Sequence, residues 1–259
     1  MDNLKEYSGG KTRGDQDVFG FHIPDGSEIH IKSIANFEGF KCRLWAPEFH
    51  GIMLDSAIRH SRDAEVIRRK LEFEYDSVHK VKELKDTTGN MANSFKVMQH
   101  AISSVALSIN SVEAWANKTI NEKVESSIEF ERSDGSIVVW GCNRIEKDAS
   151  LVEKVFSIIP ILFGIDVIKE HVTARKRFVE LISVRNTIIH LKILPKISGE
   201  KTSRNSLALM LLRRNSLLVP KNIISALSLV YQKSGSDIPA WLVHNIGTLE
   251  GYQREVKNI

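Results

Sequence analysis

The stretch NMANSFKVMQHAISSVALSINSVEAWANKTINE, residues 90–122, carries the clearest helical signal in the chain. Because an α-helix turns by about 100° per residue, apolar residues at steps of three and four fall on one side of it. Such a seam predicts one long helix that packs closely along a neighbouring helix. The seam consists of Met91, Phe95, Met98, Ile102, Val105, Ile109, Val112, Ala116 and Ile120.

A second stretch, FVELISVRNTIIHLK at residues 178–192, has a charge where its pattern favours a hydrophobic residue. Read as a helix, it has Arg185 in the middle of an apolar arc. An unpaired buried guanidinium costs on the order of several kcal/mol, so Arg185 must meet an acidic partner, line a wet surface or face a second subunit. Glu113 beside the seam is a candidate partner, although an exposed glutamate is the commoner outcome. The arc consists of Ala174, Phe178, Leu181, Ile182, Ile188 and Ile189.

Two further polar residues lie near Arg185. Asn186 and His190 are four residues apart and share the polar border of the arc. A permanent cation, an amide and an imidazole that titrates near neutral pH suit the binding of an anion and the transfer of a proton. Taken alone, His190 is more readily explained as a histidine that stabilises a helix C-terminus.

The segment Arg185-Asn186-Thr187-Ile188-Ile189-His190 resembles the motif of the HEPN family, the "higher eukaryotes and prokaryotes nucleotide-binding" helical domains. Residues 111–120 resemble the first long core helix of that family, and residues 151–164 resemble the segment before its motif helix. The resemblance covers roughly residues 90–195. It implies a mainly α (α+β) fold: a HEPN-like antiparallel helical bundle with a β-hairpin insertion and a small β-containing N-terminal portion.

Enzymes of this family are metal-independent endoribonucleases, so the resemblance implies RNA cleavage without a cofactor. The RNA 2′-hydroxyl attacks the adjacent phosphate and leaves 2′,3′-cyclic phosphate and 5′-hydroxyl ends. In this interpretation His190 transfers protons, Arg185 holds the phosphate, Asn186 orients either group, and Glu113 supports Arg185.

One histidine is poorly placed to act on both sides of the phosphorus, which favours a homodimer. The resemblance also implies that two motif helices meet across a two-fold axis, with the apolar arc facing the partner. Because the family includes toxins and phage-defence effectors, the resemblance also implies such a role for the chain. A toxin would have an antitoxin or other regulatory protein as a partner. The alternative is a non-catalytic HEPN protein for dimerisation, scaffolding or nucleotide binding. A DNA-binding regulator is less favoured, because no helix-turn-helix signal is present.

Basic charge is concentrated after the motif. Between residues 192 and 221 there are seven lysines and arginines against Glu200 alone, in a chain of net charge +4. This suits a polyanion held next to the motif, although a solvated basic loop explains it equally well. The predicted RNA-binding residues are Lys192, Lys196, Lys201 and Arg204.

The composition is that of an ordinary globular protein, with 42% hydrophobic and 26% charged residues among 259. The longest uncharged apolar run is too short to span a membrane, and the first residues do not read as a signal peptide. Cys42 and Cys142 lack metal-ligand spacing. We therefore expect reduced thiols in a cytoplasmic protein with no metal site.

The remaining patterns divide the chain into residues 1–60, a β-containing extension, and residues 61–259, a helical domain with core 90–195 and a C-terminal helical extension. In the extension, residues 19–23 and 28–34 predict a hairpin around Pro24-Asp25-Gly26, with a third strand at 40–45. Residues 59–85 are ambiguous and are interpreted as a helix. Residues 127–140 predict a hairpin with Asp134-Gly135 at its turn. Further helices are predicted from residue 151, over 166–192, over 220–232 and from Ser236-Asp237-Ile238-Pro239 to 255.

Overall fold

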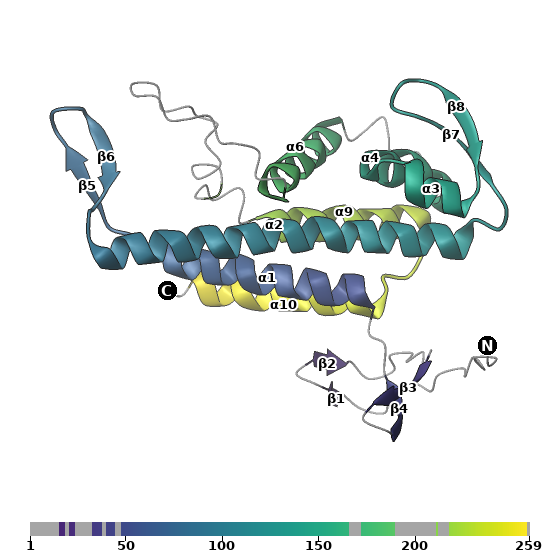
Figure 1. Cartoon of the computed structure of the whole chain (residues 1–259), viewed down its shortest axis with the longest axis horizontal. Helices are drawn as coiled ribbons and strands as arrows, with labels where there is room; N and C mark the ends of the chain where they lie inside the picture. Colours follow the sequence, from purple (N-terminus) through teal and green to yellow (C-terminus); the bar gives the residue numbers. More distant parts are fainter. Residues whose placement is uncertain are drawn as a thin grey trace.

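The computed structural model describes residues 48–165, 172–189, 211 and 218–257, and the backbone of four short strands between residues 16 and 44. The described residues are mostly helical, and the strands form two-stranded antiparallel sheets (Figure 1). The predicted fold class, mainly α with small β elements, is confirmed at this level. In the part of the chain that is described, no helix combines the length and the apolar character that a membrane crossing requires.

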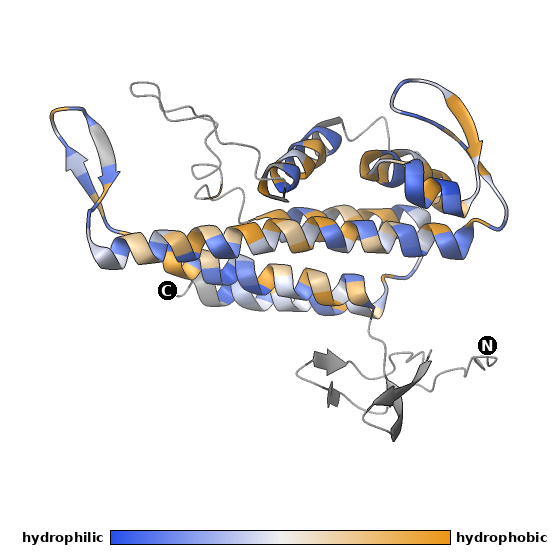
Figure 2. Cartoon of the chain, in the orientation of Figure 1, coloured by the Kyte–Doolittle hydropathy of each residue, from blue (hydrophilic) through white to orange (hydrophobic). Residues whose placement is uncertain are grey.

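Helix α2 (Thr88–Lys123) is the axis of the molecule, and the other helices lie along it (Figure 1). The Thr87 hydroxyl caps its N-terminus by accepting from the Asn90 backbone N–H at 3.2 Å. The predicted seam is buried from Val105 onward, and hydrophobic residues follow α2 along its packed length (Figure 2). Met91 and Phe95, in contrast, are 49% and 62% exposed, because the first turns of α2 project beyond the neighbouring helices.

Helices α1 (Phe49–Arg68) and α10 (Ala240–Lys257) pack together, and α1 runs along α2. Small buried residues on the two helices, Ala64 of α1 and Ala101 of α2, belong to one hydrophobic cluster, and such residues allow helices to approach closely. Helix α9 (Val219–Ser234) contacts both α1 and α2. The predicted helices near 220–232 and 240–255 are thus confirmed. The expected domain boundary at residue 60 falls inside α1.

The prediction of a helix over residues 59–85 is wrong beyond Arg68. Strands β5 (Phe73–Asp76) and β6 (Val81–Leu84) form a hairpin there instead. Its base is fastened to α2 by Asn90, whose side-chain amide donates to the backbone carbonyls of Glu72 and Lys85 at 3.0 Å. Phe73 and Tyr75 alternate with Glu74 and Asp76 in this stretch, which is the pattern of a strand.

The described N-terminal strands form two pairs that the sequence did not predict. Strand β2 (Phe21–Ile23) pairs with β1 (Gln16–Val18), and β3 (Ser33–Phe37) pairs with β4 (Phe40–Leu44). The turn and most of the second strand of the predicted hairpin around Pro24-Asp25-Gly26 lie outside the described residues, so that hairpin stays a prediction. The third strand at 40–45 is confirmed as β4.

The hairpin of β7 (Ile128–Glu131) and β8 (Ile137–Trp140) is confirmed, with Gly135 at φ +83° in its turn. Phe130 and Trp140 are buried edge to face, their ring centroids 5.4 Å apart. The hairpin turn is fastened by Glu153, whose carboxylate accepts from the Ser133 backbone N–H at 3.1 Å. Burial raises the pKa of Glu153, but hydrogen bonds from Ser150 and Ser133 outweigh this and hold it at about 2.

The chain then enters α3 (Cys142–Asp148), α4 (Leu151–Glu153), the π-helical turn η1 (Lys154–Ile158) and α5 (Ile159–Phe163). Ser150 caps α4 in a capping box with Glu153. Pro160 does not end the helix. The widened turn η1 precedes it, and Gly164 ends α5 at φ +64°.

Helix α6 (Val172–Ile189) carries the motif and packs on α2. Phe178 is buried, and Leu181, Ile182 and Ile188 pack against the core. The described residues of this arc pack against helices of their own chain, and the expectation that the arc also faces a second subunit stays a prediction. The predicted ends of the motif helix, residues 166–171 and 190–192, lie outside the described residues.

Candidate functional site

Arg185 is enclosed by oxygen acceptors at the junction of α6 and α2. Its Nη2 lies 3.0 Å from Oε2 of Glu113 and 3.2 Å from Oδ1 of Asn110, and its Nη1 donates to Oδ1 of Asn186 at 3.1 Å. The Arg185 side chain is 23% exposed and that of Glu113 39%. The sequence allowed an acidic partner, a wet surface or a second subunit next to Arg185. The structure shows an acidic partner, Glu113.

The acceptors on α2 follow from helical spacing. Asn110, Glu113 and Asn117 are three and four residues apart, so they form one polar stripe along α2. Each is partly buried, and the apolar seam lies beside them. The stripe therefore presents two amides and one carboxylate to the elements that cover this side of α2.

A second cation, Lys154, meets the same stripe from η1. Its Nζ donates to Oδ1 of Asn117 and to the backbone carbonyl of Glu146, both at 2.9 Å, and the residue is 3% exposed. Burial lowers the pKa of Lys154, and the carboxylates of Glu113 and Glu146 partly oppose this effect. π-Helical turns are frequent at functional sites, and this one begins at Lys154. We call Asn110, Glu113, Asn117, Lys154, Arg185 and Asn186 the polar cluster.

Arg185 and Lys154 carry two positive charges and Glu113 one negative charge, so the polar cluster as defined has one net positive charge, with the carboxylate of Glu146 near Lys154. Lysine and arginine only donate hydrogen bonds, and in an amide side chain only the oxygen accepts them. The contacts therefore fix how Asn110, Asn117 and Asn186 are oriented. Their NH₂ groups point away from the cations and have no acceptor among the described residues. Within the same residues, the buried Nε of Arg185 also lacks a hydrogen-bond partner. The cluster thus has spare donors together with positive charge, which is the chemistry of an anion site.

The remaining predicted site residues lie outside the described residues. These are His190, directly after the last residue of α6, and the basic residues Lys192, Lys196, Lys201 and Arg204. Their roles stay predictions. The sequence interpretation missed Asn110, Asn117 and Lys154. The two asparagines were detectable, since they share helical spacing with Glu113, whereas nothing in the local sequence points to Lys154.

Two other clusters of titratable groups join helices to one another. Nδ1 of His60 on α1 lies 2.9 Å from Nδ1 of His100 on α2. Burial, and then the nearness of His100, lower the pKa of His60. Asp55 on α1 contacts Arg59 at 2.7 Å and His244 of α10 at 3.6 Å. Because these groups lie between packed helices, we assign them a structural role. Among the described residues, no three His, Cys, Asp or Glu side chains are grouped to hold a metal ion.

Comparison with known proteins does not identify the chain. No protein-family model matches it, no curated protein matches it, and no solved structure matches it. The HEPN assignment consequently rests on the motif stretch and its two companion stretches.

Proposed function

We propose that this chain is a metal-independent endoribonuclease of HEPN type, which cleaves RNA by attack of the 2′-hydroxyl on the neighbouring phosphate. The observation that carries the proposal is the environment of Arg185. Its guanidinium is held by three oxygen acceptors, keeps part of its surface exposed, and lies in a cluster of net positive charge. This is the residue to which the motif resemblance gives the phosphate-binding role.

The proposed chemistry divides between Arg185 and His190. Attack on the phosphorus adds negative charge to the phosphoryl oxygens, and a fixed cation with spare N–H donors stabilises that charge. His190 transfers the protons, because its unperturbed pKa lies close to neutral pH. Asn186 keeps Arg185 in position through its 3.1 Å contact and directs its own NH₂ group elsewhere, toward the phosphate in this proposal. No metal is required, because the nucleophile belongs to the RNA.

The proposal includes a homodimer, since one histidine per site does not serve both the attacking and the leaving oxygen. Because the described residues of the apolar arc pack against their own chain, we propose that a second copy meets the opposite face of α6. Arg175, Lys176, Val179 and Glu180 are exposed there. Oppositely charged side chains on one face can pair across a two-fold axis.

A non-catalytic HEPN scaffold or nucleotide-binding protein is the second candidate. The contacts of Arg185 with α2 support this candidate as well. The ion pair between Arg185 and Glu113 also fastens α6 to α2, as a purely structural pair would. A role in toxicity or phage defence, with an antitoxin or other regulatory partner, rests on family analogy alone.

The test is cleavage of a labelled structured RNA and of a tRNA pool in EDTA, with end-group analysis of the products. The variants are His190→Ala and the matched control His79→Ala, which removes an exposed histidine of the β5–β6 hairpin. We expect cyclic-phosphate ends with the wild type and with His79→Ala, and none with His190→Ala. Absence of cleavage by a folded wild-type dimer on both substrates would favour the scaffold. Sedimentation analysis measures the dimer directly.

A further inference from the structure

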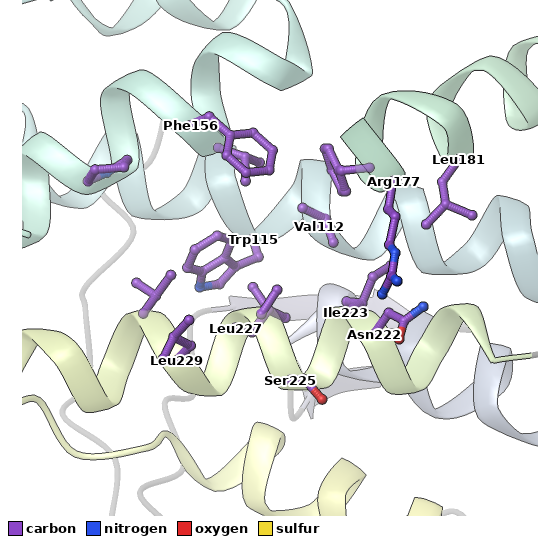
Figure 3. Close-up of a pocket in the computed structure, with 15 residues that line it drawn as sticks. Val112, Trp115, Phe156, Arg177, Leu181, Asn222, Ile223, Ser225, Leu227 and Leu229 are labelled. Carbon is purple, nitrogen blue, oxygen red and sulfur yellow. The ribbon is translucent and has the colours of Figure 1, made fainter. Parts of the chain in front are cut away.

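A cavity of about 270 Å³ lies between α2, η1, α6 and α9 (Figure 3). Its walls are apolar and partly aromatic, and they include Trp115, Phe156, Phe178, Leu181, Ile223 and Leu227. The Trp115 indole N–H is already satisfied by the Tyr231 hydroxyl at 3.0 Å. Pockets for small molecules begin at about 300 Å³ and combine such walls with a few polar groups. The cavity is slightly smaller than that lower bound and has the lining of a small-ligand site.

Three polar side chains line the cavity, and two of them are available to a ligand. Ser225 is engaged, because its hydroxyl donates to the backbone carbonyl of Lys221 at 3.0 Å. Arg177 of α6 and Asn222 of α9 are exposed, and Figure 3 shows their polar ends at the same end of the cavity. No carboxylate among the described residues pairs with Arg177, and no acidic residue lines the cavity. The cavity is therefore an apolar slot with a cation and an amide at one end.

This lining selects a class of ligand. A sugar or nucleobase has several polar atoms that the apolar walls would leave unpaired, at a cost for each of them. A cationic ligand would be repelled by Arg177. An apolar chain that ends in one anionic group matches both parts of the lining, because guanidinium binds carboxylate through two parallel hydrogen bonds.

We propose that the cavity binds a medium-chain carboxylate, with its alkyl chain against Trp115 and Phe178 and its carboxylate on Arg177 and Asn222. The proposal does not depend on ribonuclease activity. A ligand in the cavity would nevertheless contact the helix that carries Arg185, because Phe178 and Leu181 of the cavity wall belong to α6.

The test is titration of the full-length protein with decanoate, 1-decanol and decylammonium, each below its aggregation concentration. Binding is followed by tryptophan fluorescence, to which Trp115 in the wall responds, and by calorimetry. We expect one saturable site at which decanoate binds at least about tenfold more tightly than decanol, the usual effect of one charge-assisted contact. Decylammonium should bind more weakly still. Equal affinity for decanoate and decanol would overturn the proposal.

Three variants locate the site. Arg177→Gln should bring decanoate to the affinity of decanol, while the matched control Arg175→Gln, an exposed arginine of α6 outside the cavity lining, should bind as the wild type does. Ala226→Trp, at an exposed lining position, should abolish binding by filling the space. Binding that survives Ala226→Trp in a folded protein would overturn the proposal. So would absence of decanoate binding combined with loss of self-association in Ala226→Trp, which would assign the cavity to a second copy of the chain.

Discussion

Arg177 and Arg185 lie about two turns apart on the same helix, yet their surroundings differ. Arg185 meets Glu113, Asn110 and Asn186 within 3.2 Å, whereas Arg177 is exposed at the mouth of an apolar cavity. Helix α6 alone does not create this difference. The helices opposite create it, because α2 presents its polar stripe to Arg185, while α9 and η1 present mainly hydrophobic side chains near Arg177.

The largest expected difference between the two arginines is in RNA cleavage. Arg185→Ala should lower the cleavage rate by about 10²–10³-fold, the usual loss when one fixed transition-state donor is removed. Arg177→Ala should change it by less than about threefold, because Arg177 lies outside the polar cluster. Initial rates on one labelled RNA in EDTA measure both. Equal losses in the two variants would mean that only general basic charge matters.

Lys154 has no counterpart near Arg177, and its removal tests whether the polar cluster is built into the core. Lys154→Ala should lower the free energy of unfolding by about 2 kcal/mol, since it removes a buried side chain with two hydrogen bonds and leaves a void. Arg177→Ala, which removes an exposed cation, should stay within about 0.5 kcal/mol. Urea unfolding followed by circular dichroism gives both values. A Lys154→Ala variant as stable as Arg177→Ala would show that the buried contacts contribute little.

Glu113→Ala makes the surroundings of Arg185 more like those of Arg177. The substitution should lower the free energy of unfolding by about 1 kcal/mol, because both partners of this ion pair are partly exposed and solvent screens it. A double-mutant cycle with Arg185→Met separates the pair from its surroundings. A coupling energy indistinguishable from zero would mean that Asn110 and Asn186 position Arg185 without the carboxylate.

The converse substitution, Asn222→Asp, gives Arg177 the carboxylate that it lacks. An exposed pair of this kind contributes little, so the free energy of unfolding should rise by no more than about 0.5 kcal/mol. Decanoate binding should weaken, because the new carboxylate competes for the guanidinium and repels the ligand. Thermal unfolding and the fluorescence titration measure the two effects. Unchanged decanoate affinity would place the carboxylate of the ligand elsewhere.

Much of the fold was predictable, because the signals were local and periodic. The seam of α2, the Asp134-Gly135 hairpin and the helix predicted over 220–232 each depend on residues within a few positions of one another. The errors arose where a choice of partner was needed. Alternation showed that β2 is a strand but not that it pairs with β1, and the ambiguous stretch after Arg68 formed a hairpin rather than a continued helix.

The candidate site was partly predictable for the same reason. Arg185 and Asn186 are marked by a charge that interrupts an apolar arc, and Glu113 by its position beside the seam. Asn117 and Asn110 share the helical spacing of Glu113 and were missed because no partner was known for them. Lys154 could not have been found, since its burial depends on a π-helical turn that brings it to α2.

The sequence by itself determined which residues of each helix are apolar, where most helices begin, and that a buried arginine needs a partner. These are consequences of backbone geometry and of the cost of burying charge, which act within a few turns. Only the tertiary structure decided that the partner is Glu113, that the arc of α6 faces its own chain, and that an apolar cavity opens beside Arg177. Each of these depends on which helices meet, and residues more than 70 positions apart in the sequence supply the contacts that decide it.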